Sequence, residues 1–275
     1  MQGKVCIVTG SNTGIGKETA RGLAQKGATV ILACRDVAKA GAARDDIAAT
    51  TGRTDVEVEA LDLGSTASIR AFAKRFKEKH ARLDLLVNNA GVWLTSRATT
   101  AEGFESTFGV NHLGTFLLTQ ELLPLLKASA PSRIVVLSSN LHYNGKMVWD
   151  DLQFERRKFS GPAAYNQSKL ANVLFTKALS RRLEDTGVTV NAVHPGVVAT
   201  ELARSYPKLL VKLFHLFLLT PEQGAACSMH VATAPELSKV SGEYFEKSKI
   251  KLASKDAVDE AAQERLWKLS ETLLS

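Results

Sequence analysis

A glycine-rich turn joins the first strand-like segment of this chain to its first helical segment, and few folds accept such a junction. Val5–Thr9 (VCIVT) is a short apolar run rich in β-branched residues, and Thr9–Gly16 (TGSNTGIG) follows at once. Glycine permits a tight turn and leaves room for a phosphate group to approach the backbone. The following helix offers free N–H groups and the positive end of its dipole. The order of strand, glycine turn and helix therefore predicts a βαβ unit that binds a nucleotide.

The rest of the chain repeats this alternation of strand-like and helical segments. Further strands are expected at Thr29–Cys34, Val56–Leu61, Leu85–Asn88, Arg133–Ser138, Val188–Val193 and Gly242–Phe245. Helices are expected over Ile15–Lys26, Val37–Thr50, Ser65–Lys79, Ala101–Ala128, Ala163–Thr186 and Lys255–Leu274. Several strands are apolar on both faces, which indicates a parallel sheet covered by helices on each side. We predict a single Rossmann-type, doubly wound α/β domain over residues 1–275, with a mainly parallel central sheet and helices on both faces.

Composition fits such a domain and excludes several other classes of protein. With 275 residues, 45% of them hydrophobic, the chain can bury a large core without disulfide or metal. The net charge of +7 is spread as +4 over residues 1–140 and +3 over residues 141–275, so no basic arm points to nucleic acid. No stretch reaches the roughly 20 apolar residues of a spanning helix, and Met1–Lys4 leads directly into a strand, so no signal peptide is expected. The three cysteines form no CxxC pair, which favours reduced thiols and a cytoplasmic location.

The spacing of the turn, TGxxxGxG, is similar to the signature of the short-chain dehydrogenase/reductase family. Further motifs like those of the family follow in the same order: Asp62-Leu63, Asn88-Asn89-Ala90-Gly91, Asn111, Ser139, Tyr165-x-x-x-Lys169 and Pro195-Gly196. Each motif is short, but their joint order is specific, and the resemblance extends from Lys4 to about Phe245. It implies an oxidoreductase that transfers hydride between a nicotinamide cofactor and a substrate carbon.

Four of these residues resemble the catalytic set of the family. Tyr165 and Lys169 share one face of a helix because they are four residues apart. A free phenol has a pKa of about 10, and a nearby ammonium lowers that pKa toward the working pH. The resemblance implies that Tyr165 moves the proton and that Ser139 hydrogen-bonds the substrate oxygen. It also implies that Asn111 helps to hold a water linked to Lys169, while Ser138 serves the structure.

The resemblance further implies which residues bind the cofactor. They are Gly10, Ser11, Asn12, Gly14, Ile15 and Gly16 in the turn, Asp62 and Leu63 beside the adenine, Asn89, Ala90 and Gly91 after the fourth strand, Tyr165 and Lys169 at the nicotinamide ribose, and Pro195, Gly196 and Thr200 at the carboxamide. Lys17, one place beyond the last glycine, is a weaker candidate.

The end of the second strand indicates which nicotinamide cofactor is preferred. Family members that use NAD carry an acid about 20 residues past the glycines, where this chain has Cys34. Arg35 follows, and a guanidinium can bind a 2′-phosphate through two hydrogen bonds. We therefore expect NADP(H). NAD(H) is the alternative, because spacing alone does not exclude Asp36 as a ribose ligand.

The long interval between the catalytic candidates Ser139 and Tyr165 indicates the class of substrate. Ser139 and Tyr165 are 26 residues apart, about twice the usual family interval, which marks residues 140–161 as an insert. An insert of this length is similar to that of the retinol dehydrogenase-like branch of the family. The segments ACRD at 33–36 and YNQSKLAN at 165–172 also resemble sequences of that branch. The branch implies a retinal-like or other apolar aldehyde or ketone, or the corresponding alcohol. A redox-sensing NADP(H)-binding module without turnover is one alternative, and reduction of a conjugated C=C bond is another.

A very apolar helix-like stretch, residues 208–219 (KLLVKLFHLFLL), lies where the family covers its substrate. We expect a substrate lid over about residues 200–220, in preference to a contact with a membrane surface. Four large side chains are candidates for the same pocket or for the core: Trp93, Met147, Trp149 and Phe159. The six histidines form no HxxxH or HExxH pair, so we expect no metal site. A homo-oligomer through the helix of the catalytic tyrosine is compatible with the family by analogy.

Overall fold

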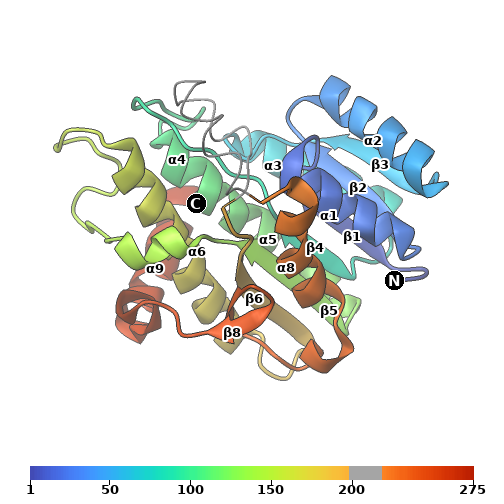
Figure 1. Ribbon diagram of the computed structural model, residues 1–275. Coiled ribbons are helices and arrows are strands. Elements are labelled where there is room, and N and C mark those ends of the chain that lie inside the picture. The colour runs from blue at the N-terminus through green and yellow to red at the C-terminus, as the bar shows by residue number, and fades with distance from the viewer. Residues whose placement is uncertain (198–218) are drawn as a thin grey trace.

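The computed structural model describes residues 1–197 and 219–275, which contain one mixed β-sheet (Figure 1). Its strand order is β3-β2-β1-β4-β5-β6-β7-β8. The strands are β1 (Val5–Thr9), β2 (Thr29–Cys34), β3 (Val56–Ala60), β4 (Leu85–Asn88), β5 (Ser132–Leu137), β6 (Val188–His194), β7 (Tyr244–Glu246) and β8 (Lys249–Lys251). All neighbours pair in parallel except β7 and β8, which are antiparallel. The strand order reverses between β1 and β4, so the predicted doubly wound fold is confirmed.

Helices cover both faces of the sheet. They are α1 (Gly14–Gln25), α2 (Val37–Thr51), α3 (Thr66–Lys79), α4 (Ser106–Phe108), α5 (Thr115–Ala128), α6 (Gly161–Arg182), α8 (Pro221–Thr233) and α9 (Glu260–Leu274), with short helices η1 (Gly109–Gly114), η2 (Asn140–Asn144), η4 (Pro235–Leu237) and η5 (Lys255–Val258). Two buried hydrophobic clusters result: one under α1, α2 and α8, the other under α3, α5, α6 and α9. Figure 1 shows α1, α2 and α8 on the opposite side of the molecule from α6 and α9.

Strand β1 shows why the sequence of the central strands lacks alternation. Ile7 packs into the cluster under α3, α5 and α6, while Cys6 and Val8 pack into the cluster under α1, α2 and α8. All three side chains have 0% exposure. A strand that is covered on both faces must be apolar throughout, as a parallel sheet between two helical layers requires.

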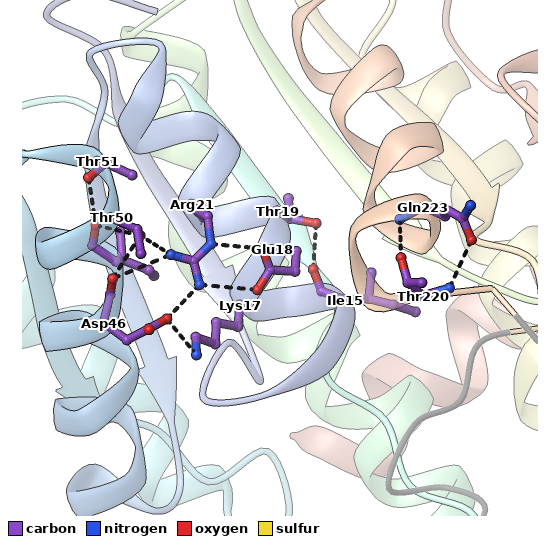
Figure 2. A network of polar contacts seen from close by, with 11 residues as sticks. Ile15, Lys17, Glu18, Thr19, Arg21, Asp46, Thr50, Thr51, Thr220 and Gln223 are labelled. Atoms are coloured by element: carbon purple, nitrogen blue, oxygen red, sulfur yellow. Dashed lines mark hydrogen bonds and ion pairs between the residues drawn. The ribbon is translucent and has the colours of Figure 1, made fainter. Parts of the chain in front are cut away.

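A polar network fixes α1 against α2 (Figure 2). The Arg21 guanidinium on α1 binds Glu18 at 2.8 Å and reaches Asp46 on α2 at 2.5 Å. The Lys17 ammonium lies 2.7 Å from the same Asp46 carboxylate. Because these ion pairs are partly exposed to solvent, the network orients α1 more than it stabilises the fold. Lys17, a candidate phosphate ligand from the sequence, is engaged with α2 instead.

The single helix predicted over Ala101–Ala128 begins five residues late, at Ser106, and is otherwise continuous to Ala128. It starts there because the buried Glu105 carboxylate accepts the N–H groups of Thr107 and Phe108. After the short α4 the helix widens into η1, a π-helix, and then continues as α5. Gly114 in this π-helix lies so close to the loop after β3 that a Cβ there would stand 2.3 Å from the Leu63 carbonyl oxygen. The widening therefore lies at a close long-range contact.

Other differences concern the C-terminal third. Strand β8 and helix α8 were not predicted, although Thr220 and Gln223 form a capping box that marks the start of α8 (Figure 2). The helix predicted over Lys255–Leu274 divides into η5 and α9, with Asp259 capping α9. The predicted lid falls outside the described residues except for its end, where the Leu219 N–H donates to the Val197 carbonyl at 2.9 Å.

The last helix packs on the helix that carries Tyr165 and Lys169. The Trp267 ring on α9 stacks on Phe175 of α6, with centroids 6.0 Å apart, and meets Phe116 of α5 edge-on at 4.9 Å. The chain therefore covers this face of α6 with its own C-terminal segment. Within residues 1–197 and 219–275, none of the helices has the length and apolarity needed to cross a membrane.

Candidate active site

A cavity of about 640 Å³ lies at the carboxyl ends of the parallel strands, where open α/β sheets bind ligands. It collects residues from the β1–α1 turn, from the ends of β2 to β5 and from α6. Among the predicted site residues, those that line it are Gly10, Asn12, Gly14, Ile15, Gly16, Arg35, Asp62, Leu63, Asn89, Ala90, Gly91, Tyr165, Lys169 and Pro195. The motifs scattered along the sequence therefore converge on one site.

Two predicted cofactor contacts in the described chain, Ser11 and Gly196, do not line this cavity. Ser11 is fully buried below the turn, where its hydroxyl donates to the Val8 carbonyl at 2.8 Å. Its role is to hold the turn from inside the protein. Gly196 has φ +89°, and a Cβ there would stand 2.4 Å from Leu219 Cδ1, so glycine is required by the chain itself. Thr200 lies outside the described residues.

The glycine turn is shaped by close backbone packing. Gly10 and Gly14 have φ +63° and +58°, in the left-handed region that favours glycine. A Cβ on Gly16 would stand 2.4 Å from Asn89 Nδ2 and 2.5 Å from the Gly10 carbonyl oxygen. Asn89 Nδ2 itself donates to the Thr9 carbonyl at 2.7 Å. The NNAG segment after β4 thus clamps the turn, and only glycine fits beneath it.

The N-terminus of α1 keeps its backbone N–H groups available. Helices α2, α3 and α6 begin with Asp36, Ser65 and Ser160, and each of these side chains accepts a backbone N–H of its own helix. The N-cap of α1 is Thr13, whose side chain makes no such bond within the described structure. Free N–H groups at a helix start bind anions, and this start opens into the cavity. The turn therefore suits the pyrophosphate of a dinucleotide.

The rim of the cavity beyond β2 carries two cations and one acid. Asp36 is the N-cap of α2: its Oδ1 accepts the Lys39 N–H at 3.0 Å, which lowers its pKa. Its Oδ2 lies 3.6 Å from the Lys39 ammonium. Arg35 is exposed at the same rim, and no carboxylate of the described residues forms an ion pair with it. Lys39, which the sequence analysis did not single out, lies in the first turn of α2 and lines the same cavity.

Of the catalytic candidates, Tyr165 lines the cavity, whereas Ser139 hydrogen-bonds Tyr165 without lining it; Ser138 lines it instead. Tyr165 is buried, and burial raises the pKa of its phenol to about 12, while a hydrogen bond with Ser139 acts in the opposite direction. Ser139 is the second residue after β5, and its Oγ accepts the Leu141 N–H at 3.2 Å. The hydroxyl can itself donate, and Asn140 Oδ1 lies 3.4 Å from it. The neighbouring Ser138 hydroxyl donates to the Lys169 carbonyl at 2.8 Å and so serves the structure.

Lys169 lies beside the Tyr165 ring, and its ammonium has a main-chain partner. Its ammonium donates to the Leu137 carbonyl at 2.9 Å and lies 5.4 Å from the centroid of the phenol ring. Burial lowers the pKa of Lys169 to about 8. Because burial dominates for both groups, each is shifted toward its neutral form.

Asn111 lies in the π-helix η1, and its amide makes three hydrogen bonds with protein partners. Its Oδ1 accepts the Val92 N–H at 2.7 Å, and its Nδ2 donates to the Val92 carbonyl at 3.0 Å and to Ser168 Oγ at 2.9 Å. The side chain does not line the cavity within the described chain. It fixes the segment after β4 against α6, and the water link to Lys169 stays a prediction.

Trp93 follows that segment and stacks on the catalytic tyrosine. The indole and the Tyr165 ring are 4.5 Å apart between centroids and 17° from parallel. Trp93 and Leu94 both line the cavity. Of the four large side chains that the sequence offered for the pocket, the other three lie elsewhere: Met147 and Trp149 pack against the core, and Phe159 packs on Phe154. Leu94 was missed, although it continues the same NNAG segment.

The donor set of the site suits an organic cofactor. Over the described ranges 1–197 and 219–275, His, Cys, Asp and Glu form no group of three that could hold a metal ion. The cavity instead offers backbone N–H groups, two rim cations, and the Tyr165 and Lys169 side chains. Such a row of anion, ribose and ring contacts fits a nicotinamide dinucleotide.

Comparisons with known proteins agree with this geometry. Residues 4–209 match the sequence profile of the short chain dehydrogenases. The chain is 51% identical to human retinol dehydrogenase 13 over 280 residues, which cover 99% of this chain and 85% of that protein. It is also 51% identical to human retinol dehydrogenase 12 over 276 residues, which cover 100% of this chain and 87% of the relative.

Solved structures share the fold. An uncharacterized protein from Mycobacterium paratuberculosis superimposes with a TM-score of 0.82 at 36% identity, over 99% of this chain and 94% of that one. A short chain dehydrogenase from Escherichia coli CFT073, complexed with NADPH, has a TM-score of 0.73 at 27% identity, over 89% and 96% of the two chains. The 3-ketoacyl-(acyl-carrier-protein) reductase from Brucella melitensis, complexed with NADH, has a TM-score of 0.71 at 25% identity, over 90% and 97%.

The fold, the site and these matches show that the chain belongs to the short-chain dehydrogenase/reductase family, and that it is an oxidoreductase of that family. Within the family, its full-length similarity places it in the retinol dehydrogenase-like branch. The family and the branch expected from the motifs are thereby confirmed.

Proposed function

We propose that this protein is an NADP(H)-preferring oxidoreductase that transfers hydride between nicotinamide and the carbonyl or alcohol carbon of an apolar substrate. One observation carries the cofactor preference: Arg35 stands free at the cavity rim among the described residues, while the neighbouring Asp36 carboxylate caps α2. A free guanidinium recognises a 2′-phosphate, and a carboxylate already accepting a backbone N–H is a poorer ligand for a 2′-hydroxyl.

The fold does not decide between the two cofactors, since the NADPH and NADH complexes described above share it. The local chemistry after β2 supports NADP(H). Cys34 is a buried thiol whose pKa is raised by burial, so it brings no negative charge to the site. Arg35 and Lys39 together place two cations within reach of one phosphate at the rim.

The protein's own groups handle the proton. When bound, the nicotinamide ring supplies or accepts the hydride. In the reductive direction the Tyr165 phenol donates its proton to the substrate oxygen, and a pKa of about 12 keeps it protonated at neutral pH. The Ser139 hydroxyl donates a hydrogen bond to the same oxygen as negative charge develops. Lys169, with a pKa near 8, supplies a cation beside the site.

The walls near Tyr165 support an apolar substrate. The Trp93 indole covers one face of the phenol ring, and Leu94 continues the wall into the cavity. Aromatic and aliphatic walls with a few directed polar groups favour an aldehyde or ketone on an apolar chain. The relatives named retinol dehydrogenase support the same class, of which a retinal-like aldehyde is one member.

Substitution of Arg35 tests the cofactor assignment. In Arg35→Ala we expect the dissociation constant of NADPH to rise about 10- to 100-fold, as the loss of charge-assisted hydrogen bonds predicts. The dissociation constant of NADH should change less than about twofold, because NADH has no 2′-phosphate. Asp36→Asn is the matched control, since it keeps a capping oxygen and should leave NADPH binding unchanged. An equal rise for both cofactors in Arg35→Ala contradicts the assignment.

A further inference from the structure

His142 stands three residues after Ser139, and both of its ring nitrogens have protein partners. Nδ1 lies 2.7 Å from the Ser139 carbonyl oxygen. Nε2 lies 3.1 Å from the main-chain nitrogen of Ser254, which comes from the segment after β8. The side chain has 0% exposure. One buried ring therefore connects the peptide of the candidate catalytic serine to a segment 112 residues further along the chain.

These partners determine where the ring carries its proton. The Ser254 N–H can only donate, so Nε2 must be the acceptor. The Ser139 carbonyl can only accept, so Nδ1 must carry the hydrogen. The ring is therefore a neutral imidazole with its proton on Nδ1, and burial, which lowers the pKa of His142, favours that neutral form.

The surroundings hold the ring in this orientation. Tyr143 packs against it with centroids 4.1 Å apart, and Tyr244 of β7 packs against it at 4.5 Å. The Tyr143 hydroxyl donates to the Leu252 carbonyl at 2.5 Å, which ties the same turn to residues 252–254 a second time. The ring cannot rotate without losing both nitrogen bonds and these two aromatic contacts.

The hydrogen bond from His142 Nδ1 holds the main-chain carbonyl of Ser139, next to the side chain that carries the hydroxyl. The Ser139 carbonyl accepts two hydrogen bonds, from the His142 main-chain N–H at 3.1 Å and from Nδ1. The Ser139 Oγ accepts the Leu141 N–H at 3.2 Å. With the carbonyl and the Oγ both held, the hydroxyl proton points to one of two neighbours, Asn140 Oδ1 at 3.4 Å or the Tyr165 phenol.

We propose that His142 is a positioning residue, which aims the Ser139 hydroxyl at the reacting oxygen by donating from Nδ1 to the Ser139 carbonyl. Residues 252–254 supply the support for the ring from the other side. This inference rests on the proposed function, because it takes Ser139 as a group that touches the substrate.

Two substitutions of His142 test its two nitrogen bonds separately. In His142→Asn, the amide nitrogen stands where Nδ1 stood and can still donate to the Ser139 carbonyl, while the bond to Ser254 is lost. In His142→Gln, the longer side chain reaches Ser254 and no longer Ser139. We expect kcat of His142→Asn to remain within about threefold of wild type and kcat of His142→Gln to fall about tenfold or more, as for other groups that orient an active residue. The reverse order overturns the proposal.

A double-mutant cycle with Ser139→Ala shows whether the effect passes through the serine. Ser139→Ala alone should lower kcat about 100-fold. Adding His142→Gln to Ser139→Ala should lower kcat less than a further twofold or so, because the group that it positions is gone. If His142→Gln costs the same factor in both backgrounds, its role is structural and the proposal fails. The dissociation constant of NADPH should be the same in all these variants.

Tyr143→Phe is the matched control for folding. It removes the bond to the Leu252 carbonyl but leaves both nitrogen bonds of His142, so kcat should stay within about twofold of wild type. A tenfold loss in Tyr143→Phe contradicts a role specific to His142. Wild-type protein that reduces no carbonyl compound overturns the proposed function itself, which is a different outcome from an active wild type whose His142 variants fail the cycle.

Discussion

The two ends of the cavity are built in different ways. At the phosphate end, the turn from Thr9 to Gly16 is shaped by backbone angles and by contacts that leave no room for a Cβ. At the catalytic end, Tyr165 is surrounded by side chains from separate parts of the chain, among them Ser139 and Trp93. The phosphate end excludes other residues by sterics, whereas the catalytic end adjusts pKa values by burial. Variants should therefore affect binding at one end and chemistry at the other.

Tyr165→Phe should produce the largest effect and should be confined to chemistry. The substitution removes the proton donor but keeps the ring that stacks on Trp93. We expect kcat for carbonyl reduction to fall about 1,000-fold or more, within the range for loss of a general acid. The dissociation constant of NADPH should change less than about threefold, since the phosphate end is untouched. Rapid-quench or steady-state kinetics measures kcat, and a parallel cofactor titration measures the dissociation constant of NADPH. Comparable losses in both quantities would contradict the separation of chemistry from binding at the two ends of the cavity.

Gly16→Ala should act at the opposite end. The new Cβ would collide with Asn89 Nδ2 and the Gly10 carbonyl, which must move the turn away from the phosphates. We expect the dissociation constant of NADPH to rise on the order of 100-fold, as loss of several oriented N–H contacts implies.

Gly41→Ala is the matched control for this glycine. A Cβ at Gly41 in α2 meets nothing within 4 Å, so binding should be unchanged. The free energy of unfolding should rise by about 0.5–1 kcal/mol, the helix preference for alanine over glycine. Normal NADPH binding by Gly16→Ala, measured by fluorescence titration, would show that steric exclusion does not shape the turn.

Lys169→Met should reveal the cost of the buried ammonium. The pKa of Lys169 in the folded protein is about 8, below the ordinary 10.5 of the unfolded chain, so folding disfavours the charged form. Below about pH 8 both states carry the proton and the full penalty applies, while between about 8 and 10.5 the unfolded state binds more protons and the penalty disappears. Lys169→Met should therefore be more stable than wild type by about 3 kcal/mol near pH 7, with a smaller difference near pH 10.5.

Urea unfolding of both proteins at the two pH values measures that difference. A Lys169→Met protein that is less stable than wild type near neutral pH would mean that the bond from the ammonium to the Leu137 carbonyl outweighs the burial cost.

Trp93→Leu should have the smallest effect and should sharpen the assignment of the apolar wall. The indole lies flat on the Tyr165 ring and lines the cavity. We expect kcat/KM to fall about tenfold for a long apolar aldehyde and less than twofold for propanal, because a short chain makes less contact with the wall. Trp93→Phe, which keeps an aromatic ring, should lie between. An equal fall in kcat/KM for both aldehydes would contradict a contact between Trp93 and the substrate chain.

Sequence reasoning succeeded where a feature is local. The starts and ends of β1, β2 and β4 agree with the prediction, because strands covered on both faces are visible as short apolar runs. The glycine turn was predicted for the same reason, since its chemistry lies within eight residues, Thr9 to Gly16. The direction of Ser11 into the protein was not, because it depends on the Val8 carbonyl beneath the turn.

Features that depend on distant partners were missed or misplaced. The π-helical widening before α5 lies where Gly114 closely approaches Leu63, which no helical period reveals. The raised pKa of Tyr165 reflects burial by the finished fold, which the four-residue spacing to Lys169 does not reveal. The stacking of Trp93 on Tyr165 joins residues from two elements 72 positions apart. Such contacts belong to the tertiary structure alone.

Transfer of deuterium tests the central claim most directly. Wild-type protein is incubated with an apolar conjugated aldehyde and with NADPH deuterated at one of the two C4 positions of the nicotinamide, each isotopomer in turn, and the product is analysed by mass spectrometry and NMR. We predict one deuterium at the former carbonyl carbon from one isotopomer and none from the other, with the C=C bond intact. Deuterium at an alkene carbon, or no deuterium from either isotopomer, would contradict carbonyl reduction at this site.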